Sequence, residues 1–292
     1  MSGPILLRGR RRRAAEAAAD PLRQVITGRR ERIIIYIILT VLMVLFAFPL
    51  YAAVVRSLQI NGIGNYISLF TDPVGGVTIW QTYFNSFAIG IMHATIVVVV
   101  STTSGYALSK LQFRGREVTF AGVLLFLAIP GVAILVPVYY ITEQLGLFNT
   151  YIGVALPEAA LTIPFGVLLM RNYGRNIPDS LMEAASLDGA GHYRVFWNVF
   201  LPLSRPAIVN LTVLCFIWSL QDFLWPSFIF TDPNLASAAQ AVQTFAGVLG
   251  QGAADVAKYN ASLVLLAIPG AVIAIFGLRF IINGLTAGGT KE

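Results

Sequence analysis

Apolar residues along this chain gather into long blocks that are separated by shorter polar segments. A block of about 20 apolar residues is long enough to cross the roughly 30 Å hydrocarbon layer of a bilayer as a helix. The pattern predicts six such helices, at residues 33–55, 85–109, 119–142, 151–173, 206–230 and 260–286. We therefore expect an all-α membrane protein with six transmembrane helices.

The positions of the positive charges predict how these helices are oriented. With the N-terminus in the cytoplasm, all but two of the 20 Lys and Arg residues lie on the cytoplasmic side, the exceptions being Arg56 and Lys258. Cytoplasmic loops of membrane proteins are enriched in these residues, so we expect both termini inside. The resulting domains are a basic tail at 1–32, a transmembrane domain at 33–288 and a C-terminal tail at 289–292. The arginines of the tail fit a segment beside anionic lipid, and no nucleic-acid partner is predicted.

Composition agrees with a membrane protein and indicates which chemistry is missing. Hydrophobic residues make up 57% of the chain and charged residues 12%, well below the charge fraction of a soluble domain. The single cysteine, Cys215, is expected to pack inside an apolar block. His93 and His192 lie far apart, so neither a metal site nor a catalytic group is predicted. No phosphate-binding loop of the Gly-x-x-x-x-Gly-Lys-Ser/Thr type occurs, so energy for any transport must come from a partner or a gradient.

The longest cytoplasmic connection, at 174–205, has the pattern of a short helix. Pro178 ends the preceding element, and Ser180 with Glu183 three residues later fits a capping box. Gly189 fits the left-handed position that closes a helix, which gives about eight residues and a length of about 12 Å. A helix this short must be held by packing. Two roles stay open for Glu183: stabilising the start of its own helix, or contacting another protein.

One motif in this connection matches a known family. Glu183-Ala184-Ala185, then Gly189, then Val199-Phe200-Leu201-Pro202 resembles the "EAA" loop of binding-protein-dependent ABC importer permeases, with Val199 in place of the usual isoleucine. The resemblance implies a coupling helix that sits in a groove of a separate cytoplasmic ATPase. The residues that it assigns to this contact are Glu183, Ala184, Ala185, Asp188 and Gly189.

Three further segments look like the smaller permease of maltose-type carbohydrate importers, and the resemblance covers about residues 33–292. These segments are 147–151, 222–226 and 284–288. The resemblance implies the type I ABC importer permease fold in a bacterial or archaeal cell membrane, and a carbohydrate or related polyol as cargo. It also implies three kinds of partner: a second homologous permease, two ATPase subunits that bind ATP and Mg in place of any cofactor in this chain, and an extracellular or periplasmic solute-binding protein.

Asp222 is the most informative charge within the predicted helices. A carboxylate inside a membrane is costly and by default indicates a cavity or pathway. Pro226 has no N–H, so we expect the helix to be kinked or opened beside Asp222. Together with Gln221, Trp218 and Trp225 it forms our candidate substrate pathway, since aromatic faces and hydrogen-bonding groups suit sugars. The alternative is that Asp222 holds its own broken helix or pairs with the second permease.

Several smaller expectations follow from single positions. Glu158 is predicted near the outer end of the fourth helix, within reach of water, and His93 is predicted to face the bundle. Pro130, Pro137 and Pro164 are candidates for kinks. The outer loop at 56–84 is expected to contain a turn or short helix, and the loop at 231–259 is long enough to contact an external protein.

Other functions are possible on the sequence alone. The cargo could be a polar solute other than a sugar. A secondary transporter driven by an ion gradient would need coupling-ion residues, and few acidic residues lie within the predicted helices. An intramembrane enzyme would need a nucleophile paired with a base, or a metal motif, on facing helices, and the sequence has no recognisable pattern of this kind.

Overall fold

A computed structural model of the protein describes the backbone of residues 28–287, with side chains at 28 and 30–277. Most of the predicted basic tail at 1–32, and all of the predicted C-terminal tail at 289–292, lie outside the described residues. The chain divides into two compact units, Met1–Val55 and Arg56–Glu292, which we treat separately. The first described helix, α3 (Arg29–Ser57), contains the first predicted span and runs through Pro49 without a break.

The described part of the second unit is built of helices joined by loops and turns. Its helices up to the middle of the chain are α4 (Gly64–Thr71), α5 (Ile79–Lys110), α6 (Arg116–Leu125), α7 (Leu135–Gln144) and α8 (Tyr151–Asn176). Its later helices are α9 (Asp179–Leu187), α10 (His192–Val195), α11 (Leu201–Leu203), α12 (Arg205–Gln221), α13 (Leu224–Ile229), α14 (Ala238–Val248) and α15 (Ala253–Ala287). Short 3-10 turns lie at Phe126–Ala128, Gly131–Ile134 and Pro233–Leu235, and a π-helical turn lies at Phe196–Phe200.

Within the described residues, four helices are long and apolar enough to cross a membrane: α3, α5, α8 and α15. Two further pairs of helical segments are long and apolar enough to cross a membrane only when the two segments of each pair are counted together. The segments Arg116–Ala128 and Gly131–Gln144 meet at 92°, and His192–Leu203 and Arg205–Gln221 meet at 72°. Four to six spans therefore fit the helices by length and composition.

Two of the predicted spans are interrupted in the structure, each beside a residue where a kink or opening was expected. The predicted helix at 119–142 is interrupted beside Pro130, which is extended (ψ 130°) and lacks the N–H that a continuing helix requires. The predicted helix at 206–230 ends at Gln221 and resumes at Leu224, which confirms the expected opening beside Asp222. The other two prolines behave differently. Pro164 lies inside an unbroken α8, and Pro137 lies in the first turn of α7, where a missing N–H costs nothing.

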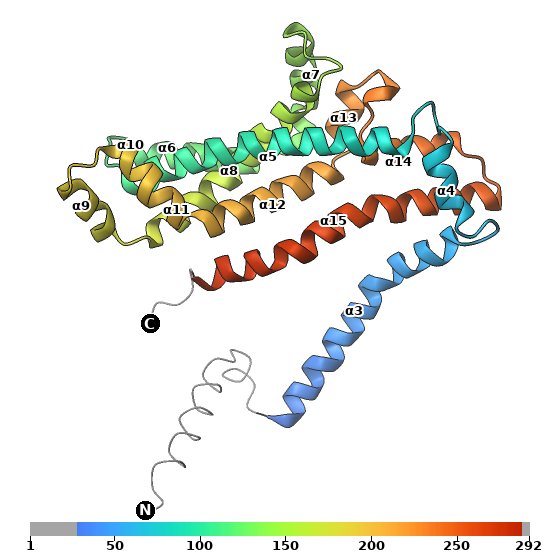
Figure 1. The fold of residues 1–292 in the computed structure, drawn as a ribbon, viewed down its shortest axis with the longest axis horizontal. Helices are drawn as coiled ribbons and strands as arrows, with labels where there is room; N and C mark the ends of the chain where they lie inside the picture. Colours follow the sequence, from blue (N-terminus) through green and yellow to red (C-terminus); the bar gives the residue numbers. More distant parts are fainter. Residues whose placement is uncertain (1–27, 288–292) are drawn as a thin grey trace, which may run out of the picture. The chain divides into compact units, whose positions relative to one another are not determined.

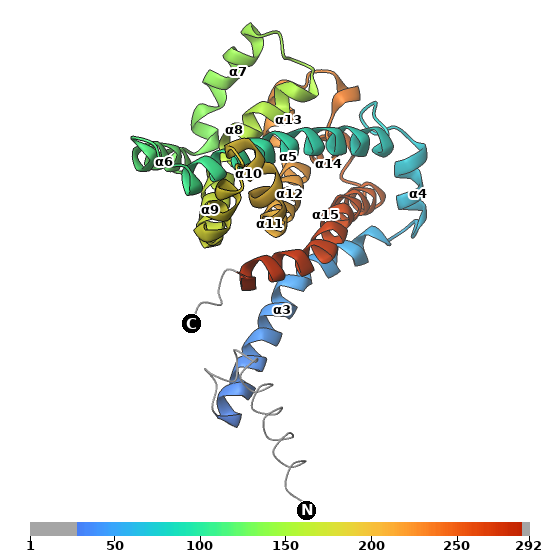
Figure 2. The ribbon, with the colours of Figure 1, turned by 60° about the vertical axis from the view of Figure 1, so that its left-hand side comes forward.

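Three helices form the centre of the second unit (Figures 1 and 2). The long helix α5 packs most extensively against α8 and also against α12, and α12 in turn packs against α15. The buried side chains between them include Val97, Met170, Leu211 and Cys215. The prediction that Cys215 packs in an apolar environment is confirmed.

The two ends of α5 are covered by different elements, as Figure 1 shows. The short helices α9 and α10 lie at its C-terminal end. At its N-terminal end lie α4, which confirms a short helix in the 56–84 loop, and α14, which was not predicted. The missed signal is a capping box, in which Ser237 accepts from the Gln240 N–H and the Gln240 side chain accepts from the Ser237 N–H.

An arginine inside the bundle ties α8 to the start of α6. Arg171 is 2% exposed, and its Nη2 donates to both carboxylate oxygens of Glu117, at 2.6 and 2.5 Å. Its Nε also donates to the Leu108 carbonyl, and its guanidinium carbon lies 3.7 Å from the centre of the Phe120 ring. A buried charge needs this degree of pairing to be tolerated. These contacts hold α5, α6 and α8 together at the C-terminal end of α5.

Candidate functional site

The helix that carries the predicted coupling residues, α9, is anchored by a lysine of α5. Lys110 is 5% exposed along its side chain, and its Nζ donates to the Ile177 carbonyl and to the Asp179 carboxylate, both at 2.6 Å. The Lys110 ammonium lowers the pKa of the exposed Asp179 carboxyl below its usual value. One buried cation thus joins the end of α5 to the first residue of α9.

The start of α9 differs from the prediction, while its end agrees. The capping box between Ser180 and Glu183 was wrong, because the helix begins one residue earlier, at Asp179, and has no side-chain cap. An acidic residue in the first turn favours the helix through its dipole instead. Gly189 has φ +79° and, as predicted, closes the helix. The N–H of Ala190 donates to the Ala185 carbonyl and that of Gly189 to the Ser186 carbonyl, which is the Schellman arrangement.

The predicted coupling residues divide into exposed and inward-facing positions. Glu183, Ala184, Asp188 and Gly189 are exposed. Ala185 instead is half-buried and packs on the core of its own chain. Not all of the predicted contact residues therefore face outward. Large apolar side chains surround the exposed positions. Leu187 is 89% exposed and Tyr193 is 86% exposed.

A groove of about 530 Å³ lies between α9 and the C-terminal end of α5. Its lining includes Lys110 from α5, Glu183 and Leu187 from α9, and His192 from α10. Tyr106 of α5 donates a hydrogen bond to the His192 carbonyl at 3.2 Å and contacts the rings of Phe196 and Phe200. The groove therefore has a rigid wall, and an apolar rim that the described part of the chain leaves uncovered.

Replacing Lys110 by methionine is expected to loosen α9. Hydrogen bonds to charged groups contribute about 1.5–3 kcal/mol each, less where the partner is exposed as Asp179 is. Amide hydrogen exchange across α9 should therefore become about tenfold faster. Lys258→Met is the matched control, since Lys258 lies 4.0 Å from Asp72 and far from α9 in the sequence. Equal exchange rates across α9 in the two variants would contradict the anchoring role.

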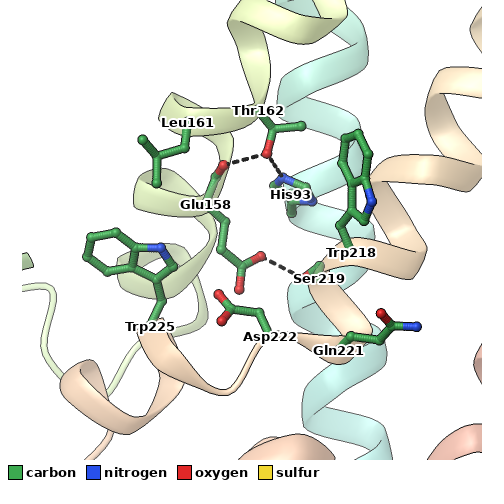
Figure 3. Close-up of a pocket in the computed structure, with 9 residues that line it drawn as sticks. All are labelled: His93, Glu158, Leu161, Thr162, Trp218, Ser219, Gln221, Asp222 and Trp225. Carbon is green, nitrogen blue, oxygen red and sulfur yellow. Dashed lines mark hydrogen bonds between the residues drawn. The ribbon is translucent and has the colours of Figure 1, made fainter. Parts of the chain in front are cut away.

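The break between α12 and α13 brings the predicted substrate-pathway residues together in one pocket (Figure 3). Asp222, Gln221, Trp218 and Trp225 all line a cavity of about 300 Å³. Asp222 Oδ1 accepts from the Leu224 N–H at 2.8 Å, so this carboxylate also holds its own broken helix, as the alternative interpretation proposed. Neither role excludes the other, because a carboxylate has a second oxygen. Contact with a substrate stays a prediction.

Glu158 is the residue whose environment was predicted wrongly. It lies on α8 and is 6% exposed, buried within the bundle. Its Oε2 accepts from the Ser219 hydroxyl at 2.6 Å, and no N–H or hydroxyl group of the described residues donates to its Oε1. In Figure 3 its carboxyl group and that of Asp222 point toward each other. The contact could not be predicted from the sequence, because α8 and α12 are far apart along the chain. Whether the two carboxyl groups meet depends on how the two helices are rotated about their axes.

His93 connects three helices at the back of the same pocket. As predicted, it faces the bundle and is 1% exposed. Its Nδ1 donates to the Cys215 carbonyl on α12, because a carbonyl oxygen can only accept, at 3.1 Å. Its Nε2 lies 3.1 Å from the Thr162 hydroxyl oxygen on α8, and that hydroxyl is 2.8 Å from the Glu158 carbonyl oxygen. Both ring nitrogens are therefore engaged by protein atoms.

The groove and the pocket are joined by one helix. His93 and Lys110 both lie on α5, and at about 1.5 Å per residue the helix between them is about 25 Å long. Because α5 is continuous over this length, one helix connects the Lys110 anchor of α9 to the pocket. The arrangement suits a protein in which an event at one end changes a cavity inside the bundle.

Comparison with known proteins identifies the family. Residues 101–285 match the family described as "Binding-protein-dependent transport system inner membrane component". The chain is 32% identical over 230 residues to the arabinooligosaccharides transport system permease protein AraQ of Halalkalibacterium halodurans, covering 78% of each chain. It is 30% identical over 229 residues to the osmoprotective compounds uptake permease protein GgtD of a Synechocystis strain, covering 78% of this chain and 76% of the relative.

A solved structure shares the fold. It is a bacterial ABC transporter involved in the import of the acidic polysaccharide alginate, with a TM-score of 0.70, at 22% identity, covering 86% of this chain and 97% of that chain. Together with the apolar helices, the family match makes this chain a multi-pass membrane protein. The match spans most of the second unit, from within α5 to the end of α15, and so includes both the groove and most of the pocket. The chain belongs to the family of binding-protein-dependent transport system inner membrane components.

Proposed function

We propose that this chain is the transmembrane permease subunit of an ATP-driven importer and moves a carbohydrate or related polyol into the cytoplasm. The observation that carries this proposal is α9. It is a short helix, fixed to the bundle by Lys110 and closed by Gly189, that exposes Glu183, Ala184 and Leu187 beside an open groove. A helix too short to be stable alone, held rigid with its apolar side chains outward, suits docking to a partner.

The topology that we propose has six spans with both termini in the cytoplasm. Each bent pair of helical segments would then count as one span. The cations Lys110, Arg171 and Arg175 gather at the C-terminal end of α5, the same end as α9, which supports placing that end in the cytoplasm. The membrane would be the inner or cell membrane of a bacterium or archaeon.

The partners follow from the family and from the two ends of the bundle. We propose that Glu183, Ala184, Ala185, Asp188 and Gly189 belong to the coupling helix, and that it docks on one of two ATPase subunits, which bind ATP and Mg. A second homologous permease would complete the pathway. An extracellular or periplasmic solute-binding protein would deliver the cargo, as supported by the alginate transporter solved in complex with a periplasmic protein.

The cargo is proposed from the relatives and from the pocket. Relatives named for arabinooligosaccharides, trehalose and maltodextrin match 71% or more of this chain. The pocket combines the indoles of Trp218 and Trp225 with the polar groups of Gln221 and Asp222, which suits both the apolar face and the hydroxyls of a sugar. The match to a permease for osmoprotective compounds keeps a different polar solute as the second candidate.

Deletion of the ATPase partner tests the proposed function. Uptake of radiolabelled trehalose, maltotriose and arabinotriose by cells with the intact importer should disappear when the ATPase gene is deleted. Glu183→Ala should lower uptake about tenfold or more through loss of a charged contact, while insertion in the membrane stays normal. Glu143→Ala, a change of an exposed glutamate on α7, is the matched control. Uptake that persists without the ATPase would contradict the importer.

A further inference from the structure

The pocket beside Asp222 has an unusual charge balance for a buried cavity. Two of its lining residues, Glu158 and Asp222, are carboxylic acids, and their side chains face each other (Figure 3). No lysine or arginine is among the lining residues that the structure describes. Two carboxyl groups this close in a water-poor site require a proton or a positively polarised partner between them.

The hydrogen bonds around the pocket show which acceptors are unused. Glu158 Oε2 accepts from Ser219, but no N–H or hydroxyl group of the described residues donates to Oε1, although only 6% of the residue is exposed. Asp222 uses Oδ1 to accept from the Leu224 N–H. A buried carboxylate oxygen without an N–H or hydroxyl donor is unfavourable, so a group that donates to it on entering the cavity is bound more tightly. The pocket therefore presents a strong acceptor to whatever occupies it.

The donors around the cavity are weak or already used. His93, the only base among the described lining residues, has both ring nitrogens engaged, by the Cys215 carbonyl and by Thr162. Ser219 donates to Glu158. Neutral donors remain in the exposed amide of Gln221 and in the indole N–H groups, and these carry no charge that could balance an anion.

The two indoles determine the shape of the cavity. Trp225 is 4% exposed and Trp218 is 42% exposed, and in Figure 3 they lie on opposite sides of the carboxyl pair. Trp218 is held edge-on against Phe165 at 5.2 Å between ring centres. An occupant thus meets apolar ring faces at its sides and acceptors between them. The negative faces of indoles also favour a cationic group.

We propose that this pocket is a charge-selective solute subsite, which takes the hydroxyl or ammonium groups of a neutral or amino sugar and rejects an acidic sugar. The proposal rests on the proposed function and deepens it by naming the chemistry of the cargo. Sugar hydroxyls donate to Glu158 Oε1 and to the Asp222 carboxylate while the sugar ring packs on Trp218 or Trp225. An ammonium group donates hydrogen bonds to the same oxygens and also carries a full positive charge. The carboxylate of a uronate would face two acids without a lysine or arginine to pair with.

Binding measurements on the assembled importer, purified without the solute-binding protein, test this selectivity. Equilibrium dialysis is performed with maltotriose, with the glucosamine trisaccharide and with the galacturonate trisaccharide at millimolar concentrations. The wild type should bind the glucosamine probe most tightly and the galacturonate probe most weakly. Glu158→Gln should weaken binding of the glucosamine probe about tenfold, which is the loss expected for one charged hydrogen bond. The difference in affinity between the glucosamine and galacturonate probes should therefore become smaller.

Two further variants keep the test decisive. Asp222→Asn retains an oxygen for the Leu224 N–H, so it should fold and should shift selectivity in the same direction. Glu143→Gln makes the same chemical change at an exposed site outside the pocket and should bind like wild type. Gel filtration of each variant complex confirms that it is assembled.

Three results would overturn the subsite. The first is galacturonate bound by the wild type as tightly as maltotriose. The second is an unchanged ratio of glucosamine to galacturonate affinity in both Glu158→Gln and Asp222→Asn, and the third is no binding of any probe by the wild type. In each case, uptake that still depends on the ATPase would leave the proposed function standing. Uptake independent of the ATPase would remove the proposed function by itself.

Discussion

Replacing Leu187 by aspartate is expected to separate this chain from the proposed ATPase partner. Leu187 is 89% exposed at the end of α9 and borders the groove that also contains Glu183. Burying a leucine side chain contributes about 1.5–3 kcal/mol, and burying an unpaired carboxylate in its place adds a desolvation cost. Association should weaken on the order of a hundredfold or more. The measurement is the amount of ATPase that copurifies with the variant, together with solute uptake.

The folded chain itself should tolerate this change. Substitutions at exposed positions away from special contacts usually change the free energy of unfolding by about 0.5 kcal/mol or less. Leu145→Asp is the matched control, since Leu145 is 64% exposed after α7, at the far end of α7 from the Pro130 break. It should copurify with the ATPase as the wild type does. Normal copurification of Leu187→Asp would show that α9 is not the docking helix.

The structure also changes which substitution probes this contact best. From the sequence, Ala184 and Ala185 were both assigned to the ATPase contact, with nothing to distinguish them. In the structure Ala184 is exposed, while Ala185 packs on the core of its own chain and its carbonyl accepts the closing hydrogen bond from Ala190. A bulky residue at 185 would disturb folding and docking together. A bulky residue at 184 affects docking alone.

The predicted spans were located well because hydropathy depends on composition and not on packing. Each of the six apolar blocks overlaps one or two helices in the described residues. The breaks were harder to predict. Pro130, Pro157 and Pro164 have the same missing N–H, yet only Pro130 ends a helix, since α8 continues through the other two. Neighbouring helices decide whether a freed carbonyl is accommodated.

Only some residues of the candidate pocket could be predicted from the sequence. Asp222, Gln221, Trp218 and Trp225 are near one another in the sequence, so a local pattern could group them. Glu158 and His93 come from α8 and α5, and their approach to Asp222 depends on the rotation of three helices. One signal was available: a carboxylate in an apolar helix indicates a buried partner or cavity whatever its distance from the end.

Replacing Gly105 by valine is expected to cause the largest loss of folding stability. α5 carries small residues at Ser101, Gly105 and Ser109, which lie on one face, and this face meets α8. A Cβ at Gly105 would lie 2.5 Å from the Met170 Cβ and 2.9 Å from the Met170 backbone carbon. A backbone atom cannot move aside as a flexible side chain can, so the two central helices must separate.

Overpacking of this kind typically costs about 1–3 kcal/mol, and the cost is higher where backbone is in the way. A loss on the order of 3 kcal/mol should therefore lower the melting temperature of the purified protein and its yield as a monodisperse sample. Gly122→Val is the matched control. Gly122 lies in α6, and apart from its own helix backbone and chain neighbours no described atom lies within 4 Å of the position that a Cβ would take. It should melt like the wild type. Equal melting temperatures of the two variants would mean that α5 and α8 are packed less closely than in the structure. The segment of α5 between Lys110 and His93 would then lack rigid support from α8.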